Sequence, residues 1–303
     1  MNITGNCLDI LPTLEANTIQ CCVTSPPYWG LRDYGVPGQM GLEKTPEEFV
    51  ENLVRVFREV RRVLRDDGTV WLNLGDSYAH DIKGSGGGWA NDPSNYAFQA
   101  QKTTPRKCNH GLKPKDLVGI PWRVAFALQA DGWYLRQDII WNKPNPMPES
   151  VTDRCTKSHE YIFLLTKSAR YYYDAEAIRE PVKDTSGKNM RAPKLGEHRK
   201  DGNYDTVTAK TYAEIKGANR RSVWTITTKP FKEAHFATFP PEIPEICIRA
   251  GSRPGDIILD PFSGAATTGL VAERLGREYI GIELNPDYVK MADKRVYDFG
   301  GVL

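Results

Sequence analysis

The sequence lacks the features that mark membrane, secreted and metal-binding proteins. No stretch approaches the roughly 18 consecutive apolar residues of a membrane-spanning helix, and the first residues, MNITGNCLDI, contain no basic segment followed by an apolar leader. The 6 cysteines include no CxxC pair, so we expect reduced, buried thiols. Cys108 and His110 supply too few ligands for a structural zinc ion. The sequence therefore predicts a cytoplasmic protein with no membrane span and no bound metal.

A formal net charge of only +2 conceals two basic segments. Residues 101–123 contain six Lys or Arg against the single acid Asp116, and residues 183–221 contain ten against five acids, so each segment has a local charge of +5. Basic segments on an otherwise acidic chain are typical of surfaces that bind polyanions, because phosphate contacts dominate such affinity. Solvated loops have the same pattern, so charge alone leaves both interpretations open.

Hydrophobic periodicity predicts helices that alternate with strands through most of the chain. The predicted strands are 19–23, 69–74, 136–141, 161–166, 256–260 and 279–283, and the predicted helices are 45–64, 122–130, 240–250, 267–275 and 286–296. Thr45 is the expected N-cap of the helix over 45–64, with Pro46 at its first position and Asp66-Asp67-Gly68 as its stop. Such alternation implies parallel βαβ units, and hence an α/β fold.

Two long polar stretches interrupt this alternation. Residues 80–112 include the run GSGGG at 84–88, and residues 174–221 are polar and basic without a persistent period. The first stretch is too long and too polar for a compact connection, so we expect it to be mobile until a partner binds. A loop that embraces DNA and an unconstrained insertion both fit its glycine content.

A turn of small residues, 263–266, follows the predicted strand 256–260. Small side chains let the backbone approach a ligand closely, and the free N–H groups at the start of the next helix attract a carboxylate or phosphate. The following strand ends in Glu283, an acid placed to accept both hydroxyls of a ribose. The sequence matches neither GxxxxGK[ST] nor GxGxxG. The turn is therefore a candidate cofactor site, although a tight structural connection would look the same.

The predicted strand 19–23 opens into the loop TSPPYW at residues 24–29. In parallel sheets, ligands bind at the carboxyl ends of strands. Two prolines fix the backbone and remove two donors, so the local carbonyls face outward as acceptors. Tyr28 and Trp29 add flat apolar faces. Acceptors beside a stacking face suit a planar ring that carries an amino group, whereas a proline-rich structural turn is the alternative.

Six motifs occur in a characteristic order: TSPPYWG, LNLGDSY, DIIWNKPNPMPES, HEYIFLLTKS, HFATFPPEIPEICI and DPFSGAATTGLVAERLGREYIGIELNPDY. In this order the sequence resembles the beta group of S-adenosylmethionine-dependent DNA amino-methyltransferases. The resemblance implies a mostly parallel, Rossmann-like sheet with helices on both faces, S-adenosyl-L-methionine as cofactor and double-stranded DNA as substrate. It divides the chain into a catalytic half, 1–173, a target-recognition region, 174–221, and a cofactor-binding half, 222–303.

The resemblance also assigns roles to individual residues. The Ser25 hydroxyl and the Pro26 carbonyl would accept hydrogens from the amine of a flipped base, which would stack on Tyr28. The expected catalytic residues are Ser25, Pro26, Pro27 and Tyr28. The expected cofactor-binding residues are Asn6, Cys7, Thr24, Phe236, Thr238, Phe239, Pro240, Asp260, Phe262, Ser263, Gly264, Thr267, Glu283 and Asn285. The expected DNA-binding residues are Trp29, Arg32, Trp141, Lys143, Arg191, Arg199, Lys200, Arg220 and Arg221.

The first position of the catalytic motif bears on the choice of base. Ser25 resembles the cytosine-N4 enzymes, while Asp or Asn there resembles the adenine-N6 enzymes, so we predict cytosine-N4 transfer with adenine-N6 as the alternative. Carbon methylation of cytosine uses a Pro-Cys dipeptide, which the sequence lacks. An RNA or protein-amide methyltransferase and a non-catalytic DNA-binding protein are alternatives from other classes. The resemblance allows a companion restriction endonuclease as partner without establishing one, and both a monomer and a homodimer remain open.

Overall fold

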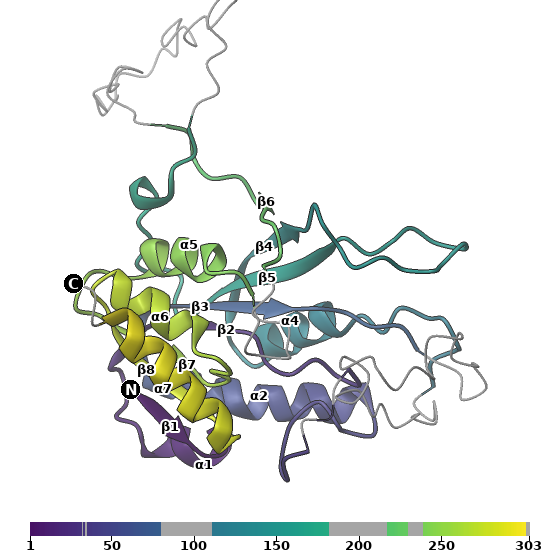
Figure 1. The fold of residues 1–303 in the computed structure, drawn as a ribbon, viewed down its shortest axis with the longest axis horizontal. Helices are drawn as coiled ribbons and strands as arrows, with labels where there is room; N and C mark the ends of the chain where they lie inside the picture. Colours follow the sequence, from purple (N-terminus) through teal and green to yellow (C-terminus); the bar gives the residue numbers. More distant parts are fainter. Residues whose placement is uncertain (32, 34, 80–110, 182–216, 230–238, 301–303) are drawn as a thin grey trace, which may run out of the picture. The chain divides into compact units, whose positions relative to one another are not determined.

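The computed structural model describes residues 1–31, 33, 35–79, 111–181, 217–229 and 239–300 (Figure 1). The chain divides into two compact units, of which the larger comprises Met1–Asp174 and Ser222–Leu303 and the smaller comprises Ala175–Arg221. The candidate cofactor turn and the TSPPYW loop both belong to the larger unit. The GSGGG run and most of the predicted target-recognition region lie outside the described residues.

An eight-stranded sheet forms the centre of the larger unit, with the strand order β1-β8-β7-β2-β3-β5-β4-β6. Every neighbouring pair is parallel except the two pairs that include β5. The carboxyl ends of the other strands and the amino end of β5 therefore lie at one edge of the sheet. The strands are β1 (Asn2–Thr4), β2 (Ile19–Thr24), β3 (Leu64–Leu74), β4 (Tyr134–Asn142), β5 (His159–Thr166), β6 (Val223–Thr225), β7 (Ile257–Asp260) and β8 (Glu278–Glu283).

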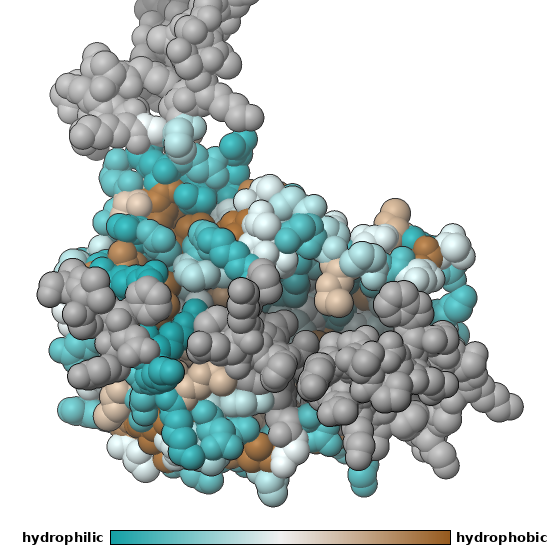
Figure 2. Space-filling view, viewed as in Figure 1, coloured by the Kyte–Doolittle hydropathy of each residue, from teal (hydrophilic) through white to brown (hydrophobic). Residues whose placement is uncertain are grey.

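Helices cover both faces of this sheet, which confirms the predicted architecture (Figure 1). One face carries α1 (Cys7–Ile10), α2 (Pro46–Val63) and α4 (Ile120–Ala130), whose apolar side chains join a single buried cluster with the sheet. The other carries α5 (Glu242–Gly251), α6 (Thr267–Arg274) and α7 (Pro286–Gly300). Short 3-10 turns occur at η1 (Leu11–Thr13) and, in the smaller unit, η2 (Glu176–Ile178). On the face shown in Figure 2, the described residues are mostly hydrophilic, and hydrophobic side chains appear in small separate groups.

Helix α2 begins as the sequence predicts but ends differently. The Thr45 hydroxyl accepts a hydrogen bond from the Glu48 backbone N–H at 3.1 Å, and Pro46 occupies the first helical turn. The helix ends at Val63, and Leu64 already starts β3. The prediction that Asp66-Asp67-Gly68 stops the helix is therefore wrong. Residue 68 lies within β3 instead, where a Cβ would come within 2.9 Å of the Gln20 carbonyl oxygen of β2.

Three short elements were not predicted, because a hydrophobic period can be recognised only in longer segments. Strand β1 pairs in parallel with β8, and the N-terminal ammonium donates to the Tyr279 carbonyl oxygen at 2.7 Å. Strand β6 pairs in parallel with β4, and α1 follows β1 directly.

Of the five described cysteines, all of which are free, only Cys155 is exposed, contrary to the expected burial of each thiol. No described helix is long and apolar enough to span a membrane.

We predict that Thr45→Ala lowers the free energy of unfolding by about 1 kcal/mol, because the first turn of α2 loses a side-chain acceptor. Thr45→Ser, which keeps the hydroxyl, should stay close to the wild type. Urea unfolding followed by circular dichroism measures both variants, and equal stability of Thr45→Ala and the wild type would contradict the capping role.

Candidate active site

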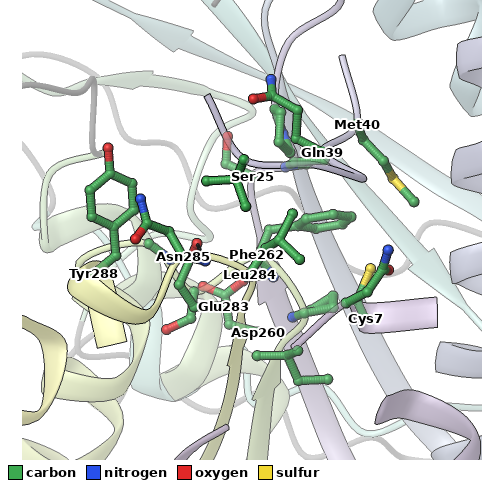
Figure 3. Close-up of a pocket in the computed structure, with 18 of the residues that line it drawn as sticks. Cys7, Ser25, Gln39, Met40, Asp260, Phe262, Glu283, Leu284, Asn285 and Tyr288 are labelled. Atoms are coloured by element: carbon green, nitrogen blue, oxygen red, sulfur yellow. Dashed lines mark hydrogen bonds between the residues drawn. The ribbon is translucent and has the colours of Figure 1, made fainter. Parts of the chain in front are cut away.

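A cavity opens at the sheet edge where β1, β2, β7 and β8 have their carboxyl ends. Each strand contributes the residues that follow it. The lining includes Asn6 and Cys7 after β1, Ser25, Pro26, Pro27 and Tyr28 after β2, residues 260–265 and Thr267 around the β7 end, and residues 283–285 around the β8 end. Cys7 and Met40 lie on one side of this cavity, and Asn285 and Tyr288 lie on the opposite side (Figure 3). The two motifs predicted to carry a cofactor and chemistry thus share one cavity.

The turn between β7 and α6 is held by hydrogen bonds to α7 and to the end of β8. Gly264 and Ala266 have φ angles of +51° and +54°, which for Ala266 is a strained left-handed conformation. Arg295 of α7 donates to the Ala265 carbonyl oxygen at 2.8 Å and to the Thr267 hydroxyl at 3.0 Å. The Gly264 N–H donates to the Glu283 carboxylate at 2.9 Å. These contacts fix the backbone against the cavity.

Asp260 lies at the end of β7, with a side chain that is buried and hydrogen-bonded through both oxygens. One oxygen, Oδ1, accepts from the Thr24 hydroxyl at 2.7 Å and from the Phe262 N–H at 3.1 Å. The other, Oδ2, accepts from the Thr268 hydroxyl at 2.9 Å. Burial raises the pKa of Asp260 to about 6, against the opposing effect of these donors. Ionised, Asp260 places a negative charge in the cavity wall, where a cationic ligand group would be stabilised.

Glu283 supplies a second carboxylate at the end of β8. Its Oε2 accepts the Gly264 N–H, and its Oε1 accepts the Asn285 N–H at 2.8 Å. Burial raises the pKa of Glu283, although three backbone donors oppose this effect. Both oxygens keep a free lone pair for a hydroxyl of a ligand. Glu283 lines the cavity, and its contact with a ribose stays a prediction.

The TSPPYW loop after β2 is hydrogen-bonded to Asn73 of β3 and Glu160 of β5. The Tyr28 phenol donates to Glu160 Oε2 at 2.6 Å and accepts from Asn73 Nδ2 at 2.9 Å, and the same nitrogen lies 3.3 Å from the Ser25 hydroxyl. Burial raises the pKa of Tyr28 well above its ordinary value, so the phenol stays protonated. At residue 75, a Cβ would come within 2.4 Å of the Tyr28 ring, so the ring position requires Gly75.

Asn73 and Glu160 are functional candidates that the sequence did not reveal. Both lie within quoted motifs, but Asn73 is one polar residue in an apolar strand, and the predicted strand began at 161, just after Glu160. Asn73 Oδ1 is buried and has no hydrogen-bond partner among the described residues. Lys143, a predicted DNA contact, instead pairs with Glu160 and lies 4.3 Å from the centre of the Trp141 ring.

Several predicted site residues lie away from the cavity wall. Thr24 is buried behind Asp260, and Pro240 is buried at the start of α5, while Phe239 does line the cavity. The indoles of Trp29 and Trp141 are buried and donate to the Glu43 and Ile226 carbonyl oxygens. These contacts favour structural roles for both tryptophans. Six predicted residues lie outside the described part of the chain: Arg32, Arg191, Arg199, Lys200, Phe236 and Thr238.

The two predicted DNA contacts that the structure describes in the smaller unit both bond within that unit. Arg220 donates to the Ile178 carbonyl oxygen at 2.9 Å, and Arg221 pairs with Glu180 at 2.8 Å. The Arg221 side chain remains 76% exposed, so its guanidinium stays accessible to a phosphate. Among the residues that the structure describes, no group of three or more His, Cys, Asp or Glu could hold a metal ion.

Comparison with known proteins shows the family to which the chain belongs. A family profile described as DNA methylase, covering N6 and N4 amino-methyltransferases, matches residues 19–294. The chain is 49% identical to type II methyltransferase M.Cfr9I of Citrobacter freundii, over 96% of this chain and 86% of the relative. It is 48% identical to type II methyltransferase M.SmaI of Serratia marcescens, over 97% and 89% of the two chains.

Solved structures share the fold. PvuII DNA methyltransferase (cytosine-N4-specific) superposes with a TM-score of 0.65 at 19% identity, covering 99% of this chain and 91% of its own. A DNA modification methylase of Thermus thermophilus, complexed with S-adenosyl-L-methionine, superposes with a TM-score of 0.63 at 22% identity, covering 100% and 95%.

The fold is thus shared with solved DNA methylases, and the family profile and the relatives at nearly half identity define a DNA amino-methyltransferase. The chain belongs to the N6/N4 DNA methylase family, and the predicted S-adenosylmethionine-dependent DNA amino-methyltransferase is confirmed.

We predict a pH-dependent stability difference between the wild type and Asp260→Asn. The folded-state pKa of about 6 lies above the ordinary value of 3.8, so the folded protein binds more protons than the unfolded chain between these values. The stabilisation from this group is complete below pH 4 and is lost as the pH rises through 6. Relative to Asp260→Asn, the wild type should lose on the order of 1 kcal/mol between pH 5 and 8. Urea titrations measure this, and parallel pH profiles would refute the buried carboxylate's role.

We also predict that Gly75→Ala slows methyl transfer by at least about ten-fold, since the added methyl group must displace the Tyr28 ring. Gly255→Ala is the matched control for loss of a glycine, because no atom lies within 4 Å of its added Cβ, although its φ of +83° makes it the more strained substitution. Single-turnover rates with labelled cofactor compare the two. A Gly75→Ala rate equal to the wild type would contradict the requirement for this ring position.

Proposed function

We propose that the protein transfers a methyl group from S-adenosyl-L-methionine to the exocyclic N4 amine of cytosine in double-stranded DNA. The observation that carries this proposal is that Ser25 and Pro26 line the same cavity as Asp260, Phe262 and Glu283. The Ser25 hydroxyl and the Pro26 carbonyl are both oxygen acceptors, and an exocyclic amine presents two hydrogens.

The residues around the β7 and β8 ends fit the cofactor. When bound, S-adenosyl-L-methionine supplies an electrophilic methyl group on a cationic sulfonium. Asp260 provides negative charge in the cavity wall, and Phe262 provides an apolar face beside it. Glu283 keeps free lone pairs for ribose hydroxyls, because its two backbone contacts use only one per oxygen. We therefore assign these three residues to cofactor binding.

The catalytic loop prepares the amine for direct attack. An exocyclic amine is a weak nucleophile because its lone pair is delocalised into the ring. Hydrogen bonds from the amine to Ser25 and to the Pro26 carbonyl favour a pyramidal nitrogen with a free lone pair. The Tyr28 ring, whose phenol is hydrogen-bonded to Glu160 and Asn73, offers the flipped base a stacking face. This arrangement requires no covalent intermediate.

The relatives support the choice of DNA substrate and base. M.Cfr9I and M.SmaI are type II methyltransferases at nearly half identity over most of the chain, which supports a place in a restriction-modification system with a companion endonuclease. PvuII methyltransferase, which shares the fold, is cytosine-N4-specific. Residues 174–221 and their basic charge are assigned to target recognition.

The product nucleoside tests this proposal. We predict that unmodified genomic DNA incubated with methyl-labelled cofactor yields labelled N4-methyldeoxycytidine after nucleoside digestion and mass spectrometry. Ser25→Ala should slow the transfer by about 100-fold, whereas Thr13→Ala, which removes an exposed hydroxyl outside the cavity, should not. Label in N6-methyldeoxyadenosine would overturn the choice of cytosine, and label in neither nucleoside would overturn DNA amine transfer altogether.

A further inference from the structure

Glu160 lies where four elements of the catalytic half meet. It is the second residue of β5, the one described strand that runs against its neighbours, so its side chain reaches the edge at which the remaining strands end. Its Oε2 accepts from the Tyr28 phenol at 2.6 Å and from Asn73 Nδ2 at 3.0 Å, and its Oε1 pairs with Lys143. Only 13% of the Glu160 side chain is exposed. Removing a carboxylate from water costs free energy, and the three contacts of Glu160 offset this cost only when all of them are made.

Ser25, Tyr28 and Glu160 are connected through their oxygens. Asn73 Nδ2 lies 3.3 Å from Ser25 Oγ and 2.9 Å from the Tyr28 oxygen, and the Tyr28 phenol donates to Glu160 Oε2 at 2.6 Å. A hydrogen bond with Ser25 opposes the rise in the Tyr28 pKa, as expected when the Ser25 hydroxyl donates to the Tyr28 oxygen. Asn73 cannot take part as a base, because its amide nitrogen only donates and an amide oxygen binds protons very weakly. Lys143 is a cation that faces the same carboxylate. Among the described residues that contact Ser25 or Tyr28 through these bonds, Glu160 is therefore the one group able to hold an additional proton.

Amine methylation leaves one proton to be removed. As the amine nitrogen forms its bond to the methyl carbon, the carbon–sulfur bond breaks and its electron pair stays on sulfur, so the nitrogen carries the positive charge. The nitrogen must then lose a proton to give the neutral methylamine. Tyr28 cannot lose its proton and remain a phenolate, because burial keeps the phenol protonated. Tyr28 can therefore give up a proton only as it receives another one.

We propose that Glu160 is the terminal acceptor of the proton released from the methylated amine, reached through Ser25 and Tyr28. The amine proton moves to Ser25 Oγ, the Ser25 proton moves to the Tyr28 oxygen, and the Tyr28 proton moves to Glu160 Oε2. The positive charge of the sulfonium and the negative charge of Glu160 are both gone at the end, so charge balances. Glu160 then releases the proton to solvent through its exposed side. Glu160 is thus a positioning residue that acts through Tyr28.

This inference rests on the proposed role of Ser25 but does not depend on whether the base is cytosine or adenine. The test uses the full chain, unmodified genomic DNA and labelled cofactor under single-turnover conditions, with total transferred label as the readout. Glu160→Ala should transfer methyl groups about 100-fold more slowly, with cofactor and DNA affinities within about two-fold of the wild type. Sodium formate, which can occupy the vacated space as a small carboxylate, should restore at least ten-fold of the lost rate.

Two further variants distinguish proton transfer from a structural contribution. Tyr28→Phe keeps the ring but removes the phenol oxygen, so it should be slow and insensitive to formate. Glu245→Ala removes a carboxylate of an exposed ion pair with Arg249 on α5 and should match the wild type with and without formate. A wild-type rate for Tyr28→Phe, or a Glu160→Ala rate that formate leaves unchanged, would overturn the proton route. A wild-type rate for Ser25→Ala would instead overturn the proposed function itself.

Discussion

The hydrogen bond from Thr24 to Asp260 joins the two loops that line the cavity. Thr24 ends β2 and precedes the loop that contains Ser25 and Tyr28, while Asp260 ends β7 and precedes the turn of small residues 263–266. The same carboxylate accepts from Thr268 in the first turn of α6. Because β2 and β7 are neighbours in the sheet, this contact joins two side chains that are 236 positions apart in the sequence. Shifting either strand end would move the loop after β2 away from the turn after β7, with which it shares the cavity.

The reversed strand β5 provides the second constraint. In a fully parallel sheet, the start of a strand would lie at the edge opposite the cavity. Because β5 runs antiparallel to β3 and β4, Glu160 lies next to the ends of those strands, close to Asn73 and Lys143. The catalytic loop consequently rests on a layer of polar contacts, whereas the apolar sheet below that layer forms the main core.

Much of the larger unit could be predicted from sequence, for identifiable reasons. Helix α2 carries a capped start and a regular apolar stripe, and the β7–α6–β8 segment has a small-residue turn followed by an acid, so the sequence indicated the local structure and the residues that line the cavity. The short strands β1 and β6 were not predicted, since three residues show no period and their pairing is entirely long-range. Asn73 and Glu160 were not predicted, because they become candidates only through contacts with residues that are distant in the sequence. The buried indoles of Trp29 and Trp141 show the same limit, because an aromatic residue beside a functional motif can face the core.

A crystal structure of the full chain with a non-reactive cofactor analogue and a duplex that contains the methylated sequence would test the central claim directly. We expect a flipped base stacked on Tyr28, with its exocyclic amine within hydrogen-bond distance, about 3 Å, of Ser25 Oγ and the Pro26 carbonyl oxygen. The analogue's sulfur should lie in the cavity beside Asp260 and Phe262. A base whose amine contacts neither Ser25 nor Pro26, or an analogue bound outside the cavity, would contradict the proposed active site.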